Sequence, residues 1–106
     1  MANDKKLLQE NAEILKAIAH PVRLCIARRL WREGSCNVTA MQACLDMPQS
    51  TVSQHLGKLR QAGIIEGEHR GLEVFYSLND ERVRRIMSIL FAQGTAEGLD
   101  SWQKRH

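Results

Sequence analysis

The chain has 106 residues, of which 43% are hydrophobic and 25% charged, and its formal net charge is +3. This length predicts a single domain over residues 1–106, with a modest core that dimerisation would supplement. No apolar run approaches a membrane span and no signal-peptide block follows the N-terminus, so we expect an intracellular, cytoplasmic protein. The odd set of cysteines, Cys25, Cys36 and Cys44, is expected to carry free thiols there.

Two helices are predicted before residue 35. Apolar residues at helical spacing indicate a first helix over residues 4–19, which His20 and Pro21 interrupt. Proline suits the first turn of a helix, so a second helix is expected over residues 21–32. Gly34 is its predicted C-cap.

The next two helices are expected to form a helix-turn-helix. A short helix fits residues 38–45, with Asn37 or Thr39 as its N-cap. Residues 46–48 make a tight break, and a fourth helix follows over residues 49–62 with Gly63 closing it. Two helices joined by a short turn, the second with a polar outer face, are typical of this motif.

After Gly63 the apolar period changes from helical spacing to alternation. Residues 64–69 and 72–78 are predicted strands around a turn at Arg70 and Gly71. Asn79 and Asp80 then cap a fifth helix that ends near Gly94, and residues 95–106 are expected to be a frayed tail. The predicted fold is mainly α with a small β-hairpin, an α+β fold in the order α-α-α-α-β-β-α.

The fourth helix has two chemically distinct faces. At 100° per residue Val52, Leu56 and Leu59 share the inward face. Small or polar residues point away, where an ordinary solvated helix would carry glutamates and lysines: Ser50, Gln54, Gly57, Lys58 and Gln61, with Thr51 and Ser53 on the flanks. Glutamine can bond adenine in bidentate fashion, whereas a lysine contacts phosphate without discriminating bases. The pattern therefore favours DNA binding over a merely solvated face.

The predicted DNA-binding residues lie on this helix and on the hairpin after it. They are Gln49, Ser50, Thr51, Ser53, Gln54, His55, Lys58 and Arg60 on the helix, and His69 and Arg70 on the hairpin. His55 falls at the edge of the buried face, so it either bonds a phosphate or braces the helix against its neighbours. The basic hairpin tip either lies along the minor groove or backbone, or is an ordinary charged turn.

With these elements in order, the chain resembles the ArsR/SmtB family of winged helix-turn-helix repressors. The matching segments are Leu-Lys-Ala-Ile-Ala-His-Pro-Val-Arg-Leu at 15–24, Gln-Ser-Thr-Val-Ser-Gln-His-Leu at 49–56, Leu-Arg-Gln-Ala-Gly-Ile-Ile at 59–65 and Phe-Tyr-Ser-Leu at 75–78. The resemblance spans nearly all of residues 10–92. The resemblance implies a homodimer formed through the first and last helices. This dimer would bind double-stranded operator DNA with inverted-repeat symmetry and repress transcription.

The metal sites that the resemblance implies lack their ligands. A Cys-Val-Cys site would fall on Asn37, Val38 and Thr39, where both thiolates are missing. A second site would pair an aspartate with a histidine, but here the pair is Asp80 and Arg82, and its later positions fall near Gln93 and Ala96. A guanidinium repels a metal, so we expect no metal and no other cofactor.

The sequence does not show which signal the regulator responds to. One alternative is a thiol-based response to an oxidant or persulfide, using Cys25, Cys36 or Cys44. The other is that all three cysteines are small, buried and unreactive. Arg28 and Arg29 make Cys25 the first to test. Another alternative is a winged helix used for protein interaction. No catalytic residue is predicted, because no nucleophile–base pair or phosphate loop is present.

Overall fold

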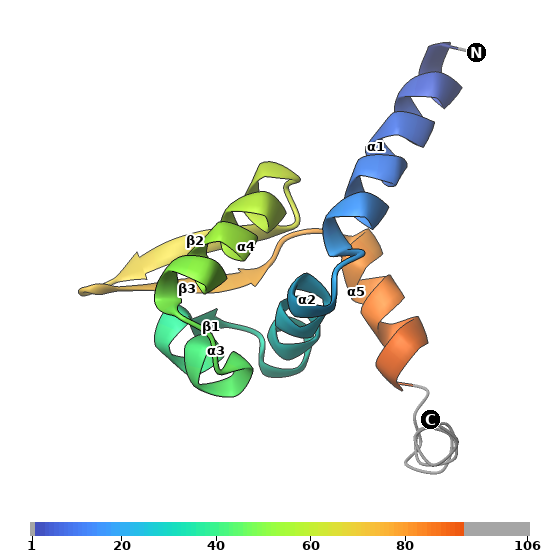
Figure 1. Ribbon diagram of the computed structural model, residues 1–106. Coiled ribbons are helices and arrows are strands. Elements are labelled where there is room, and N and C mark those ends of the chain that lie inside the picture. The colour runs from blue at the N-terminus through green and yellow to red at the C-terminus, as the bar shows by residue number, and fades with distance from the viewer. Residues whose placement is uncertain (1, 93–106) are drawn as a thin grey trace.

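The computed structural model describes residues 2–92, which form a mostly helical fold with a three-stranded antiparallel sheet (Figure 1). The helices are α1 (Ala2–Ile18), α2 (Pro21–Glu33), α3 (Val38–Leu45), α4 (Gln49–Gln61) and α5 (Glu81–Met87), which a π-helical turn, η1 (Ser88–Ala92), extends. The strands are β1 (Cys36–Asn37), β2 (Ile65–Arg70) and β3 (Glu73–Leu78). The predicted end near Gly94 and the predicted tail lie outside the described residues.

Local capping hydrogen bonds set the boundaries of α2 and α3. The Nδ1 atom of His20 accepts a hydrogen bond from the Val22 amide at 3.1 Å, ahead of the predicted proline start. At the other end of α2, Gly34 has φ 86° and its amide donates to Leu30, which confirms the predicted C-cap. Asn37 is the N-cap of α3, since its Oδ1 accepts from the Ala40 amide at 2.9 Å.

The turn between α3 and α4 uses a left-handed residue. Asp46 has φ 54° and donates its amide to the Gln42 carbonyl at 2.9 Å. Aspartate tolerates this conformation better than most side chains. Pro48 then precedes α4, and its carbonyl accepts hydrogen bonds from the Thr51 and Val52 amides. The turn is therefore short and fixed, and it sets the direction in which α4 leaves α3.

The sheet has the strand order β1-β3-β2. Strand β1 was not predicted from sequence, and it pairs antiparallel with β3 through Cys36 and Tyr76. The hairpin turn lies at Gly71 and Leu72, one residue later than predicted, so Arg70 ends β2 and pairs with Glu73. The sheet thereby joins the hairpin to the start of the helix-turn-helix.

The core draws on every helix and on the sheet. Its largest fully buried side chains come from α2, α3, α4, the α4–β2 connection and α5: Ile26, Leu30, Met41, Val52, Leu59, Ile64, Val83 and Met87. Burying a side chain of this size contributes about 1.5–3 kcal/mol relative to leaving it exposed. Packing on its buried side therefore fixes the orientation of α4, and its opposite side stays exposed.

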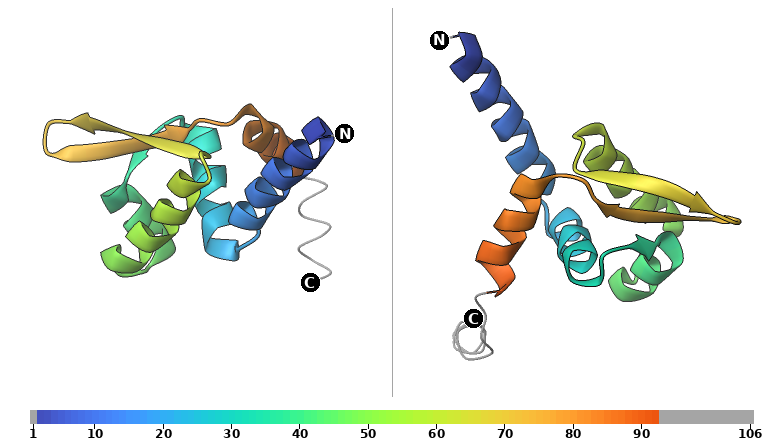
Figure 2. Two further views of the ribbon diagram at one scale, coloured as in Figure 1. Left: turned by 90° about the horizontal axis from the view of Figure 1, so that it is seen from above. Right: turned by 180° about the vertical axis from the view of Figure 1, so that it is seen from behind.

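The hairpin and helix α1 project from different parts of this core. In Figure 2 the hairpin extends to one side, while α1 and α5 lie at the other end of the molecule. Residues 4–10 of α1 are all exposed, and among residues 4–18 only Ile14 and Ile18 are buried. Within residues 2–92 no helix is long and apolar enough to cross a membrane.

Candidate nucleic-acid interface

Helix α4 has the two faces that the sequence predicts. Val52 and Leu59 are 0% exposed and Leu56 is 2% exposed, so this side anchors the helix in the core. The opposite side is solvent-exposed and polar, formed by Ser50, Ser53, Gln54, Lys58 and Gln61. Between Asp46 and Glu66 the sequence has no acidic residue, so nothing on α4 repels a phosphate backbone.

Gly57 lies on the outward side of α4, in the middle of the helix. A Cβ atom placed there would meet no other atom within 4 Å. Packing within the chain therefore does not require glycine at this position, and glycine also weakens the interior of a helix. The missing side chain leaves the α4 backbone open to close approach from outside.

His55 contacts the start of the neighbouring helix α2, as the bracing alternative requires. Its ring lies 4.7 Å from the His20 ring, and Arg23 Nη1 is 3.3 Å from His55 Nδ1. Arg23 also donates to the Ala17 carbonyl, which links the end of α1 to α4. Because arginine only donates, His55 Nδ1 must accept, and its proton is on Nε2. A phosphate contact through Nε2 stays a prediction.

This environment predicts a pH dependence of stability. Burial, then His20, Arg23 and Lys58, lower the pKa of His55 below its ordinary 6.5. As the pH falls, the unfolded chain therefore binds a proton at His55 before the folded chain does. The stabilising contribution of neutral His55 is complete above pH 6.5 and is lost as the pH falls toward the pKa of His55 in the folded state. We expect the free energy of unfolding in urea to fall from pH 7.5 to pH 5.5, and His55→Gln to reduce that slope. Equal slopes would contradict the assignment.

The two predicted basic residues of the hairpin point to opposite faces. Ile65, Gly67 and His69 alternate with Glu66, Glu68 and Arg70 along β2, and Ile65 is buried against the core. Arg70 lies on the outer face, where its Nε is 3.0 Å from Glu68 and its guanidinium is 4.8 Å from the Phe75 ring centroid. The structure therefore does not bring His69 and Arg70 together as one basic tip.

Leu72 at the hairpin tip was overlooked in the sequence. It is 105% exposed, beside Gly71 in the turn. Between this tip and the start of α4 lies an open groove of about 310 Å³, whose walls include Gln49 and Ser53. Asn37 Nδ2 donates to Glu73 in the same groove at 3.1 Å, so that carboxylate is held by a hydrogen bond.

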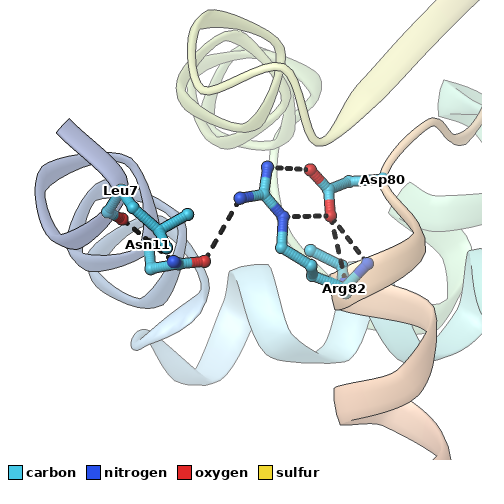
Figure 3. Close-up of polar contacts among 5 residues, drawn as sticks. Leu7, Asn11, Asp80 and Arg82 are labelled. Atoms are coloured by element: carbon cyan, nitrogen blue, oxygen red, sulfur yellow. Dashed lines mark hydrogen bonds and ion pairs between the residues drawn. The ribbon is translucent and has the colours of Figure 1, made fainter. Parts of the chain in front are cut away.

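Asp80 and Arg82 stand where the resemblance would place a second metal site, and a network of protein groups joins them (Figure 3). Arg82 Nη2 lies 2.9 Å from Asp80, and Arg82 Nη1 donates to Asn11 Oδ1 on α1 at 3.2 Å. Asp80 also caps α5 by accepting from the Arg82 and Val83 amides. The bonds to Arg82 lower the pKa of Asp80. Among residues 2–92 no three His, Cys, Asp or Glu side chains are grouped to hold a metal.

The three cysteines differ in exposure. Cys36 is buried at 3%, Cys25 is half-buried and Cys44 is exposed, and all three are free. The interpretation that all three are buried is therefore wrong for Cys44, because the α3 face that carries it turns outward.

Known proteins match this chain in sequence and in structure. Residues 18–68 match the family model of a helix-turn-helix domain. The transcriptional repressor PagR of Bacillus anthracis is 43% identical over 83 residues, covering 78% of this chain and 83% of that protein. Its crystal structure has a TM-score of 0.75 at 42% identity, covering 81% of this chain and 98% of PagR.

Two further relatives come from mycobacteria. The repressor SmtB of Mycobacterium tuberculosis is 40% identical over 83 residues, covering 78% of this chain and 61% of SmtB. A solution structure from Mycobacterium bovis is described as a homodimeric winged helix-turn-helix DNA-binding domain and a possible ArsR-family regulator. Its TM-score is 0.77 at 25% identity, covering 100% of this chain and 93% of that one.

The fold and the exposed polar face of α4 define a winged helix-turn-helix transcriptional regulator, with the β2–β3 hairpin as the wing. The similarity to PagR extends over most of both chains, and it identifies the family. The chain belongs to the ArsR/SmtB family of transcriptional repressors.

Proposed function

We propose that this chain, as one domain over residues 1–106, is a cytoplasmic, homodimeric repressor that reads operator DNA of inverted-repeat symmetry with α4. The observation that carries the proposal is the α4 face: polar, exposed, free of acidic residues and held rigidly from behind by three buried side chains. Such a face can donate and accept hydrogen bonds in a major groove without repelling the backbone. The relatives named as repressors support the same output.

The N-terminal half of α4 is the proposed base-reading segment. Recognition helices contact base edges mainly with their N-terminal residues. Gln49, Ser50, Ser53 and Gln54 are exposed in this half, and Thr51 is half-buried beside them. Lys58 and Arg60 lie one to two turns later, where they would contact phosphates. His55, His69 and Arg70 are proposed as additional backbone contacts.

An exposed apolar surface supports the dimer. Large hydrophobic side chains on α1 and η1 are about half or more exposed within the part of the chain that the structure describes: Leu7 at 53%, Leu8 at 70%, Leu15 at 54%, Ile89 at 65% and Leu90 at 48%. Both elements lie at the end of the molecule away from the wing (Figure 2). Exposed apolar patches on small soluble domains commonly mark an interface. The homodimeric relative from Mycobacterium bovis supports a second copy as the occupant.

Specificity can be tested by titrating the chain against two labelled duplexes, one from the promoter of its own gene and one of random sequence. We expect tighter binding to the promoter by at least about 10³-fold, with affinity for both falling as salt rises. Equal affinity for the two duplexes would overturn the specific-reader proposal and favour a winged helix that serves protein interaction.

Lys58→Ala should separate phosphate binding from base reading. A phosphate-contacting lysine contributes to all sequences alike, so this variant should weaken both duplexes equally and reduce the salt slope by about one. The measurement is a salt titration of wild type and variant on each duplex. A loss confined to the promoter duplex would instead assign Lys58 to base reading.

Gly57→Ala should change stability and DNA binding in opposite directions. The helix should gain about 0.5–1 kcal/mol, because glycine is less favourable than alanine in a helix interior and the added methyl meets nothing. The same methyl should weaken promoter binding if the duplex approaches the α4 backbone here. Urea unfolding and DNA titration measure the two effects, and a stabilised variant with unchanged affinity would contradict the close approach.

A further inference from the structure

A hollow of about 240 Å³ opens where the end of α1 meets α2 and α4. Its charged lining comes from all three helices: Glu13 and Lys16 on α1, Arg23 on α2 and Lys58 on α4. The remaining walls are uncharged. At about 30 Å³ for each molecule of liquid water, the hollow has room for a phosphate group.

The charge of this lining is unbalanced. Three cationic side chains stand against one carboxylate, that of Glu13, and within residues 2–92 no ion pair joins any two of the four. Cations gathered around a small space repel one another, and an anion bound among them is attracted by all of them. The lining therefore favours a negatively charged ligand.

Arg23 is held in position by two neighbours. Its Nε donates to the carbonyl of Ala17 on α1, and its Nη1 lies 3.3 Å from Nδ1 of His55 on α4. Its Nη2 makes no hydrogen bond within the described part of the chain. A guanidinium that is already fixed loses little conformational freedom on binding an anion, and its planar donors match the oxygens of a phosphate.

The two lysines of the hollow are exposed, so their ammonium groups are accessible to a ligand that enters from solvent. The positive charge of this corner also acts on His55. After burial, the charges of His20, Arg23 and Lys58 lower the pKa of His55. This is the effect of cations that no anion of the chain fully neutralises.

The hollow adjoins the exposed face of α4 and avoids the proposed dimer surface. Lys58 and Gln61, both in its lining, lie one turn apart on the exposed side of α4. On α1, Lys16 is turned about 100° around the helix axis from Leu15, which belongs to the exposed apolar surface. An anion in the hollow would therefore contact the DNA-facing helix without entering the proposed dimer contact.

We propose that this hollow is a phosphate-binding site in which Lys16, Arg23 and Lys58 together hold one phosphate group. Operator DNA is the expected source, and this assignment rests on the proposed function, because α4 brings the DNA backbone beside the hollow. A free phosphate or a phosphorylated small molecule offers the same chemistry, and it would compete with the duplex for Lys58. For either source Arg23 supplies oriented N–H donors and the lysines supply charge.

The first arm of the test titrates variants against the promoter duplex and the random duplex over a range of salt. Lys16→Ala should weaken binding to both by about two- to fivefold, the contribution of an exposed ion pair. Glu13→Gln should strengthen binding to both, because it removes the carboxylate of the lining. Lys6→Ala is the matched control, since Lys6 is exposed on the same helix about 15 Å earlier. An equal effect of Lys6→Ala and Lys16→Ala would overturn the proposal.

The double variant Lys16→Ala, Lys58→Ala decides whether the two lysines share one phosphate. Each neutralised phosphate contributes about 0.9 to the salt slope on duplex DNA. A shared phosphate predicts that the double variant reduces the slope by about one, no more than Lys58→Ala alone. A reduction of about two would mean two separate phosphate contacts and would contradict the shared site.

The second arm compares melting temperatures in pyrophosphate and in chloride at constant ionic strength. If pyrophosphate stabilises the wild type but not Lys16→Ala, and this variant binds DNA normally, the hollow takes a free phosphate. No effect of Lys16→Ala in either arm would refute a phosphate site. If the wild type does not prefer the promoter, the proposed function fails, whereas the random duplex and pyrophosphate still decide whether the hollow binds phosphate.

Discussion

Replacing Leu8 and Leu15 together by glutamate is expected to convert the protein to monomers. The two side chains lie seven residues apart on one face of α1, at 70% and 54% exposure, and make no core contact whose loss would unfold the domain. Opposing carboxylates in an apolar interface repel each other and carry an uncompensated desolvation cost. Light scattering after size-exclusion chromatography should show the change in mass.

The same double variant should lose most of its operator affinity. Two linked half-site contacts exceed one by about 10²–10⁴ in affinity, and a monomer retains only one. Leu72→Glu is the matched control for oligomeric state, because this leucine is even more exposed but lies at the wing tip. A double variant that stays dimeric, with an unchanged far-ultraviolet circular dichroism spectrum, would place the interface elsewhere.

Gln54→Ala is expected to weaken operator binding by about 1–3 kcal/mol and to relax the preference at one base position. Gln54 is exposed at the outward centre of α4, and its amide can make a bidentate contact with adenine. Binding to a panel of operators, each substituted at one position, measures both effects. The fold should be unaffected, because the side chain packs against nothing in the core.

Gln61→Ala is the control for this variant. Gln61 is the same residue type on the same face of α4, seven residues and about 10 Å further along the helix. It should leave the base preference unchanged if the N-terminal half of α4 enters the groove. A change of preference in Gln61→Ala with none in Gln54→Ala would reverse the proposed orientation of the helix.

Local signals explain why most elements could be predicted. The bounds of α3 follow from the Asn37 cap and the break at Asp46, both of which act within a few residues. The inward face of α4 follows from the spacing of Val52, Leu56 and Leu59, because helical periodicity reports burial directly. Glycines at 34 and 63 mark helix ends through their positive φ angles.

Contacts between distant segments explain what was missed. Strand β1 has two residues, too few for an alternating pattern, and exists because β3 pairs with it. The contact of His55 with Arg23 joins positions that no local pattern connects. Cys25 and Cys44 line a common hollow although they lie on separate helices, and the opposite orientations of His69 and Arg70 depend on where the hairpin turn falls.

The most direct test is a hydroxyl-radical footprint of the reduced chain on the promoter of its own gene at physiological salt. A dimer reading with two α4 helices should protect two symmetry-related half-sites whose centres are about one helical turn of DNA apart. Gln54→Ala should protect the same two half-sites only at higher protein concentration, because it loses about 1–3 kcal/mol of operator binding. Uniform protection by the wild type, with no half-sites of inverted symmetry, would contradict the account.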